Sequence, residues 1–202
     1  MEKLGLGYEA LRRLNPKLIY CAITGYGRTG PYVDKGGFDL IAQGFSGLMS
    51  ITGEPGGAPV KAGSPIADIN AGIFAALGIV SALHARHATG RGQMVDTSLM
   101  EAAIQQTYWQ SAIYFATGEN PGPTGSAHIL TAPYQAFPTA DGWINVGGAN
   151  QSNWERIAKA IGREDLLADP RFATNGDRMK HLAELTPIIA ERMKSCPSAH
   201  WI

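Results

Sequence analysis

The chain has 202 residues, and its 17 basic side chains are balanced by 17 acidic ones. A nucleic-acid-binding surface usually leaves a basic excess, so this balance argues against a nucleic-acid partner. The two cysteines, Cys21 and Cys196, lie far apart and fit no metal-ligand spacing, and we expect free thiols in a reducing compartment. The first residues contain no apolar core of the signal-peptide type, so we expect a soluble protein that is cytoplasmic or organellar, and we take cytoplasmic as the prediction.

The first predicted elements are a helix over residues 8–14 and a short buried strand over residues 18–24, which is rich in apolar and β-prone side chains. The strand leads into a literal G-x-G-x-x-G from Gly25 to Gly30. A dinucleotide-binding fingerprint needs a helix that opens at the third glycine, where N–H groups meet phosphate. Pro31 follows instead, so we predict a glycine-rich ligand loop at the end of a strand rather than a nicotinamide site.

Residues 38–49 carry apolar side chains at helical spacing, which predicts one helix. A loop rich in glycine and proline, residues 51–62, then leads to a long run of small and apolar residues, 66–83. Because the run is apolar on all sides, we expect a helix that is buried in protein and capped by a left-handed Gly90. Its polar and glycine interruptions argue against a membrane span.

Asp68 lies where that loop becomes the helix. One interpretation is a helix cap, because an aspartate side chain accepts hydrogen bonds from unpaired backbone N–H groups. The other is a nucleophile, which the positive end of the helix keeps ionised and which points into a cleft. The position alone favours the cap.

Residues 94–97 suit a short strand, and a capping box from Ser98 to Glu101 opens a predicted helix over residues 99–116. Beyond the turn-rich residues that follow, Asp141 and its neighbours join two strands in a predicted hairpin. The two strands of this hairpin are expected over residues 133–137 and 143–146. A first helix is expected from Ser152 or Asn153 to residue 161, and a second helix over residues 177–194.

These elements predict an α/β protein with two domains. Residues 1–116 read as part of a larger α/β domain, residues 117–132 as a linker, and residues 133–202 as a smaller α+β domain. The elements at both ends suggest a segment of a longer protein.

Three other patterns point to weaker hypotheses. His84 and His87 lie three residues apart, with Asp96 nearby, but the converging ligands of a metal site are missing, so we predict no metal. Ser46 misses the G-x-S-x-G nucleophile elbow by one position, which argues against a serine hydrolase. Four cations flank the glycine-rich turns and suit either phosphate contacts or a solvated surface: Lys35, Lys61, Arg28 and Arg91.

Several segments, taken in order, resemble the class III CoA-transferase family (the CaiB/BaiF type, which includes formyl-CoA transferase and the carnitine CoA-transferases). No single segment is decisive, but the ordered set spans nearly the whole chain. The segments are ITGYGRTGPY, GGFDLIAQGFSGLMSITGEP, the stretch through Ala67-Asp68, ATGRGQMVDTSLMEA, APYQAFPTADGW and DPRFATN.

The resemblance implies that Asp68 matches the family's catalytic aspartate, which reverses the preference for a cap. It also implies that coenzyme A (CoA) is bordered by two groups of residues, Gly25, Tyr26 and Gly27, and Lys35, Gly36, Gly37 and Phe38. Related α-methylacyl-CoA racemases carry a histidine at the place of Phe38. A phenylalanine cannot move a proton, so this difference favours acyl transfer over racemisation.

The resemblance implies a Rossmann-like large domain, interlocked homodimers, and members much longer than this chain. The implied substrates are an acyl-CoA and a small carboxylic acid, without a prosthetic group, a membrane or a nucleic acid. Oxyanion donors would come from a glycine-rich loop, either Gly147 and Gly148 or Gly122 and Gly125. An acyl-CoA racemase or isomerase, and a non-catalytic CoA-binding or dimerisation fragment, stay open as alternatives.

Overall fold

A computed structural model describes residues 1–202. The chain forms two compact units, Met1–Pro123 and Thr124–Ile202, each with its own interior. The boundary between them lies inside the segment 117–132. Helices and strands occur in both units, so the structure is mixed α/β.

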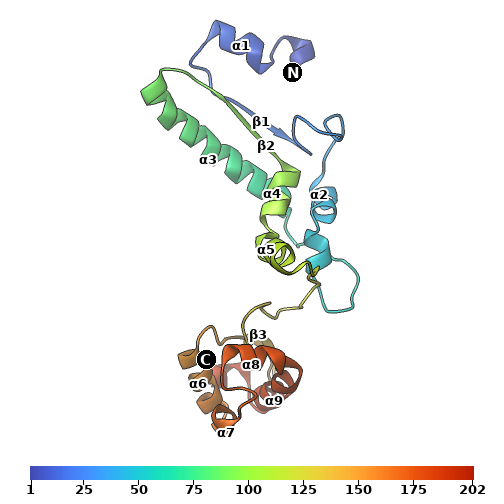
Figure 1. Ribbon diagram of the computed structural model, residues 1–202, viewed down its shortest axis with the longest axis vertical. Coiled ribbons are helices and arrows are strands. Elements are labelled where there is room, and N and C mark those ends of the chain that lie inside the picture. Colours follow the sequence, from blue (N-terminus) through green and yellow to red (C-terminus); the bar gives the residue numbers. More distant parts are fainter. The chain divides into compact units, whose positions relative to one another are not determined.

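The first unit holds a parallel pair of strands, β1 (Tyr20–Thr24) and β2 (Met94–Ser98), with Tyr20 opposite Met94 and Thr24 opposite Ser98. Figure 1 shows the long α3 helix running alongside this pair. A crossover helix of this kind is how parallel strands are joined. Two strands are fewer than a Rossmann-like sheet needs, so that finer assignment stays a prediction. The remaining elements of the unit are η1 (Glu2–Leu4), α1 (Tyr8–Leu14), α2 (Asp39–Phe45), η2 (Leu48–Ile51), α3 (Ile66–Thr89), α4 (Leu99–Gln105) and α5 (Tyr108–Thr117).

The α3 helix contacts its neighbours through small residues. A Cβ atom at Gly78 would lie 2.6 Å from Val95 Cγ1, so only glycine lets the helix lie this close to β2. The buried side chains of the helix are four alanines: Ala67, Ala71, Ala75 and Ala82. A small cluster of Ala42, Ala67 and Ala103 joins α2, α3 and α4.

The prediction that this helix is buried all round is wrong for this chain. Large apolar side chains lie on its other side, and Ile73 and Leu77 are 55% and 64% exposed. The reason is that alanine and glycine form the packed face, while the branched residues find no partner within the chain. By length and composition alone α3 could cross a membrane.

Two predicted helices of this unit are interrupted. Residues 38–49 form α2 and η2 because Gly47, at φ 84°, takes the left-handed conformation between them. The helix predicted over 99–116 divides into α4 and α5 at Thr107. There the Thr107 Oγ1 hydroxyl donates to the Ile104 carbonyl at 2.8 Å, which competes with the helical ladder.

The second unit contains the predicted hairpin, with β3 (Tyr134–Pro138) antiparallel to β4 (Trp143–Gly147). Its helices are α6 (Gln151–Ala160), α7 (Asp165–Ala168), α8 (Asn175–Lys180), α9 (Leu182–Lys194) and α10 (Ser198–Trp201). The single helix predicted over 177–194 is wrong, because His181 leaves the helical conformation and separates α8 from α9. Large side chains form one core: Phe137, Val146, Trp154, Ala158, Ile161, Leu166, Phe172, Leu185, Ile189 and Met193.

Candidate active site

Asp68 lies in the first turn of α3, and its side chain is exposed. The N-cap residue of the helix, Pro65, makes no side-chain capping bond, and neither does Asp68, so the helix-cap interpretation of Asp68 is wrong. The Asp68 carboxylate makes no hydrogen bond or ion pair within the chain. Both carboxylate oxygens are therefore accessible to a ligand at the start of α3.

A second aspartate, from α2, caps this helix instead. Asp39 Oδ1 accepts a hydrogen bond from the Ala67 N–H at 2.9 Å, and Asp39 Oδ2 accepts one from Gln43 Nε2 at 2.7 Å. Gln43 Oε1 in turn accepts from the Ala62 N–H at 2.8 Å, and the Gln43 side chain is fully buried. Our sequence reasoning missed both residues. Their signal is a polar pair four residues apart on an otherwise apolar helix.

The two predicted CoA-bordering segments are packed together. A Cβ atom built at Gly25 would lie 2.7 Å from Gly37 Cα, so the loop after β1 touches the chain just before α2. The Gly25 carbonyl also accepts from the Met100 N–H at 3.0 Å, which ties the loop to α4. No helix opens at Gly30, and the next helix begins only at Asp39, as expected when the dinucleotide fingerprint was set aside.

Phe38 and Asp68 are brought into one neighbourhood by the residues beside them. Phe38 precedes Asp39 directly, and Asp39 is hydrogen-bonded to Ala67, which precedes Asp68. The Phe38 side chain is 76% exposed. The structure therefore groups the residues singled out from the sequence, from Gly25 to Gly27 and from Gly36 to Phe38, around the start of α3.

An aromatic cluster lies at the same loops. The Tyr26 ring centroid is 5.3 Å from that of Tyr32 and 5.9 Å from that of Phe45, and Tyr32 and Phe45 are 5.2 Å apart. Tyr32 and Phe45 are both exposed. The cluster gives the glycine-rich loop a stiff apolar border.

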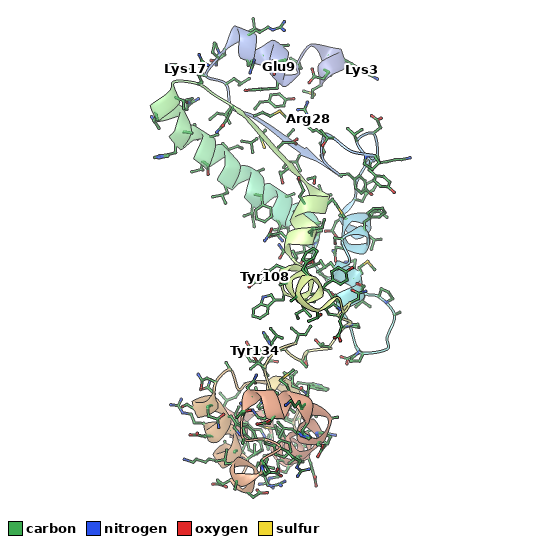
Figure 2. The ribbon with its side chains drawn as sticks, in the orientation of Figure 1. Lys3, Glu9, Lys17, Arg28, Tyr108 and Tyr134 are labelled. Atoms are coloured by element: carbon green, nitrogen blue, oxygen red, sulfur yellow. The ribbon has the colours of Figure 1, made fainter.

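The four cations considered as phosphate contacts differ in their surroundings. Arg28 lies 3.6 Å from Glu2 in an ion pair and 3.2 Å from Met94 Sδ, and Figure 2 shows it between the amino-terminal segment and the strands. Lys61 Nζ donates to the Ala62 carbonyl at 3.0 Å and so folds back onto its own loop. Lys35 and Arg91 are exposed and make no ion pair within the chain, which leaves them available to an anion.

The glycines considered as oxyanion donors are unequal. The Gly148 N–H donates to the Pro133 carbonyl at 2.7 Å, so this candidate is wrong, because the donor is already engaged. Gly147 pairs with Tyr134 at the end of the hairpin. Gly122 and Gly125 make no hydrogen bond through their N–H groups within the chain.

The other hypotheses find no support in the structure. Ser46 ends α2, and its hydroxyl donates to the Gln43 carbonyl at 3.2 Å. It lines a cavity of about 370 Å³ that Asp68 does not reach. No group of three or more His, Cys, Asp or Glu residues could hold a metal.

Asp96, which lies near His84 and His87 in the sequence, is affected by its own surroundings in the strand pair. Burial raises the pKa of Asp96, while Arg28 opposes that shift.

Together the fold and the site define a mixed α/β protein that presents an unpaired carboxylate beside a glycine-rich loop. The chain belongs to CoA-transferase family III, whose family model matches residues 1–202. The resemblance drawn from the sequence motifs is thereby confirmed.

Three curated relatives are similar to nearly the whole chain. The succinate–glutarate CoA-transferase of Agrobacterium fabrum is 44% identical over 190 residues, which are 94% of this chain and 48% of that protein. The succinyl-CoA–D-citramalate CoA-transferase of Chloroflexus aurantiacus is 41% identical over 191 residues, 94% of this chain and 48% of that protein. The succinyl-CoA:glutarate CoA-transferase of Mus musculus is 35% identical over 202 residues, 100% of this chain and 46% of that protein.

Solved structures agree with this assignment. A CaiB/BaiF family protein from Brucella suis superposes with a TM-score of 0.78 at 40% identity, covering 96% of this chain and 51% of that one. A Mycobacterium tuberculosis protein, Rv3272, superposes with a TM-score of 0.85 at 31% identity, covering 100% and 53%. The chain therefore spans about half the length of the proteins it matches.

Proposed function

We propose that the whole protein transfers coenzyme A from an acyl-CoA donor to a small carboxylic acid through a covalent intermediate on Asp68. The observation that carries this proposal is the exposed, unpaired Asp68 carboxylate in the first turn of α3, within a chain of CoA-transferase family III. Three relatives are named for succinate or succinyl-CoA with glutarate or citramalate as the second acid. Those names favour short dicarboxylic acids as donor and acceptor here.

The proposed reaction has four balanced steps. An Asp68 carboxylate oxygen attacks the thioester carbonyl, and the C–S bond breaks to give a mixed anhydride and CoA thiolate. The thiolate attacks the aspartyl carbonyl, which releases the donor acid and leaves an aspartyl-CoA thioester. The acceptor carboxylate attacks this thioester, and the C–S bond breaks to give a second mixed anhydride, between the acceptor and Asp68, and CoA thiolate. The thiolate then attacks the acceptor's carbonyl and restores the Asp68 carboxylate.

The surroundings of Asp68 suit this role. The Asp68 carboxylate is exposed and has no partner within the chain, so its oxygens are accessible to a thioester carbonyl. Each tetrahedral intermediate needs a donor for its oxyanion, and the unengaged N–H group of Gly122, which lies in the same unit as Asp68, is a candidate. The CoA ester would border Gly25, Tyr26 and Gly27 and the segment from Lys35 to Phe38, with Lys35 free to meet a phosphate.

The test is an Asp68→Asn variant of the whole protein, assayed for CoA exchange between succinyl-CoA and glutarate. We expect a loss of at least about 10³-fold in kcat, because the amide has no nucleophilic carboxylate. Asp165→Asn, which removes an exposed carboxylate of the second unit, is the matched control and keeps normal activity. Exchange at the wild-type rate in the Asp68 variant would disprove the nucleophile assignment.

Two alternatives to CoA transfer, a racemase and a non-catalytic fragment, can be distinguished from it by assays on the same protein preparation. An acyl-CoA racemase would exchange the α-proton with deuterated solvent in the absence of an acceptor acid, whereas the exposed Phe38 supplies no proton carrier. A non-catalytic fragment would bind CoA in a calorimeter without any turnover.

We also propose that the protein is a cytoplasmic homodimer. The dimer is supported by the exposed apolar side of α3, marked by Ile73 and Leu77, because isolated soluble proteins rarely leave such a surface uncovered. The cytoplasmic location follows from the sequence expectation alone. Light scattering of the whole protein tests the dimer, and a monomer at micromolar concentration would contradict it.

A further inference from the structure

Two hydrogen bonds join α2 to the segment that carries Asp68, and a third links the two α2 side chains that make them. The Asp39 carboxylate accepts a hydrogen bond from the Ala67 N–H, and the Gln43 amide oxygen accepts one from the Ala62 N–H. The Gln43 amide nitrogen donates to the Asp39 carboxylate. The bonded residues are 28 and 19 positions apart in the sequence. The pair thus fixes the loop before α3 and the first turn of α3 relative to a separate helix.

The bond from Asp39 acts one residue before the nucleophile. A hydrogen bond to the Ala67 N–H fixes the start of α3, and the next residue is Asp68. The Ala67 side chain is fully buried beside Ala42 of α2, so this turn has no room to shift toward α2.

The same bond also leaves Asp68 free. An acidic residue in the first turn of a helix can satisfy the unpaired N–H groups of its own helix end. Here the Ala67 N–H is already taken by Asp39, and Pro65 supplies no N–H at all. The Asp68 carboxylate therefore has one fewer local donor to turn back to.

We infer that Asp39 and Gln43 are positioning residues that hold the Asp68 carboxylate outward for attack on the CoA thioester. This inference rests on the proposed function, since it needs Asp68 as the nucleophile. Both carboxylate oxygens of Asp39 are engaged in the network, so Asp39 acts through its hydrogen bonds and not as a second base. The full burial of the Gln43 side chain makes its two bonds obligatory, because a buried amide left unpaired is costly.

The network can be broken and rebuilt by exchanging its acid and amide. Asp39→Asn keeps an acceptor for Ala67 but sets its NH₂ group against the NH₂ group of Gln43. Gln43→Glu keeps an acceptor for Ala62 but sets two carboxylates against each other. The double variant Asp39→Asn/Gln43→Glu restores all three bonds, with the new amide at position 39 as donor and the new carboxylate at position 43 as a double acceptor, and conserves net charge.

We expect each single variant of the whole protein to lower kcat for CoA exchange by about 10- to 100-fold, the cost of a displaced reacting group. The KM for succinyl-CoA should change by less than about threefold, because remote binding contacts are untouched. The double variant should return to within about threefold of wild-type kcat. Hydroxylamine converts acylated Asp68 to a hydroxamate, which peptide mass mapping detects. The amount of this hydroxamate should rank the wild type, the double variant and the single variants in the same order as kcat does.

Asp141→Asn is the matched control, because Asp141 also caps a helix from outside, at the Ser198 N–H, but in the second unit. It should leave kcat unchanged. Single variants that turn over at the wild-type rate would overturn the inference, as would a folded double variant no faster than the singles. An active Asp68→Asn enzyme would remove the proposed function itself, whereas an inactive one beside fully active Asp39 and Gln43 variants removes only the positioning role.

Discussion

The backbones of Gly25 and Gly37 are in direct contact: a Cβ atom at Gly37 would lie 2.4 Å from Gly25 Cα. This contact joins the loop that follows β1 to the turn that precedes α2. Neither glycine has a positive φ, so glycine is required here for space and not for backbone conformation. The two segments predicted to border CoA are therefore fixed to each other before any ligand arrives.

The first prediction concerns this contact. Gly37→Ala should destabilise the chain by about 1–3 kcal/mol, the usual cost of forcing an extra carbon into a packed site. Urea unfolding of the variant measures the change. Gly36→Ala is the control, because a Cβ atom at Gly36 meets nothing within 4 Å. Equal stability of the two variants would show that the loops separate freely.

The second prediction concerns a buried cation in the second unit. Arg178 is 1% exposed and donates to the carbonyls of Ala132 at 2.7 Å and Phe172 at 3.0 Å, while its guanidinium lies 5.3 Å from the Trp154 ring centroid. Arg178→Met keeps an unbranched apolar stem but removes the guanidinium, which leaves both carbonyls unpaired. We expect a loss of about 3 kcal/mol or more in the free energy of unfolding.

Tryptophan fluorescence during urea unfolding measures this loss. Arg156→Met is the matched control, because Arg156 is exposed on α6, and it should stay within about 0.5 kcal/mol of wild type. A change of that small size in the Arg178 variant would mean that water replaces the lost donors.

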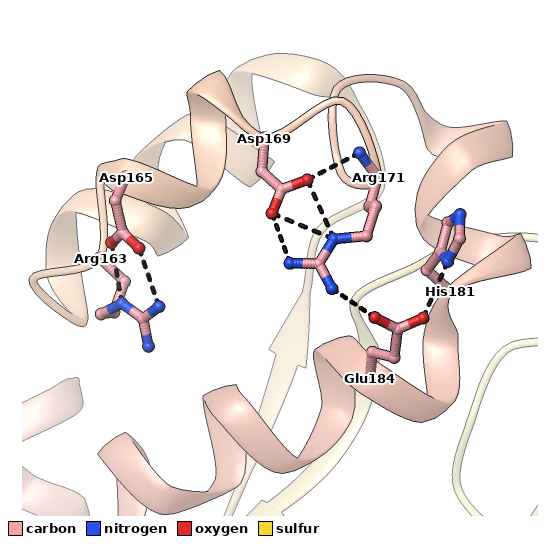
Figure 3. Close-up of polar contacts among 6 residues, drawn as sticks. All are labelled: Arg163, Asp165, Asp169, Arg171, His181 and Glu184. Carbon is pink, nitrogen blue, oxygen red and sulfur yellow. Dashed lines mark hydrogen bonds and ion pairs between the residues drawn. The ribbon is translucent and has the colours of Figure 1, made fainter.

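The third prediction concerns acid stability. Figure 3 shows Arg171 between Asp169 and Glu184, with His181 on the other side of Glu184. Hydrogen bonds from Arg171 lower the pKa of Asp169, and those from His181 and Arg171 lower the pKa of Glu184. A lowered pKa in the folded state adds stability above the unfolded value, about 4, and this contribution is lost as the pH falls through the folded value.

We therefore expect the melting temperature to decline as the pH falls below about 4, where these carboxylates become protonated. Arg171→Gln should lower the melting temperature slightly at pH 7 and flatten its decline in acid. The cluster is exposed, so added salt should reduce the difference between the two proteins. An unchanged acid slope in the variant would assign the decline to other groups.

Local signals in the sequence were sufficient for several elements. The helix over residues 8–14 has the bounds of α1, and Gly90 ends α3 at φ 68°, as predicted. Ser98 accepts from the Glu101 N–H at 3.1 Å, which confirms a cap at the start of α4. These features depend on neighbours within four residues, which a sequence shows directly.

Features that depend on distant contacts were missed. The Asp39 and Gln43 network needs α2 beside the start of α3, and no spacing within either segment shows that. The break at Thr107 was missed although it is local, because its hydroxyl bonds back to the Ile104 carbonyl while threonine also occurs inside unbroken helices, so the residue type alone does not predict a break. The burial of α3 was overestimated because its apolar composition indicates a partner without saying whether the chain itself provides it.

The contrast between the two interiors gives the halves of the chain opposite tolerances to mutation. In the second unit Trp154, Phe172 and Leu185 fill the centre, so truncation leaves holes and enlargement elsewhere is absorbed at the rim. On the packed face of α3 the contacting atoms are methyl groups and bare backbone, so truncation removes little, whereas an added carbon at Gly78 would push β2 away. A saturation library should consequently show depletion of bulky side chains at the packed positions of α3 and of small ones at the core positions of the second unit.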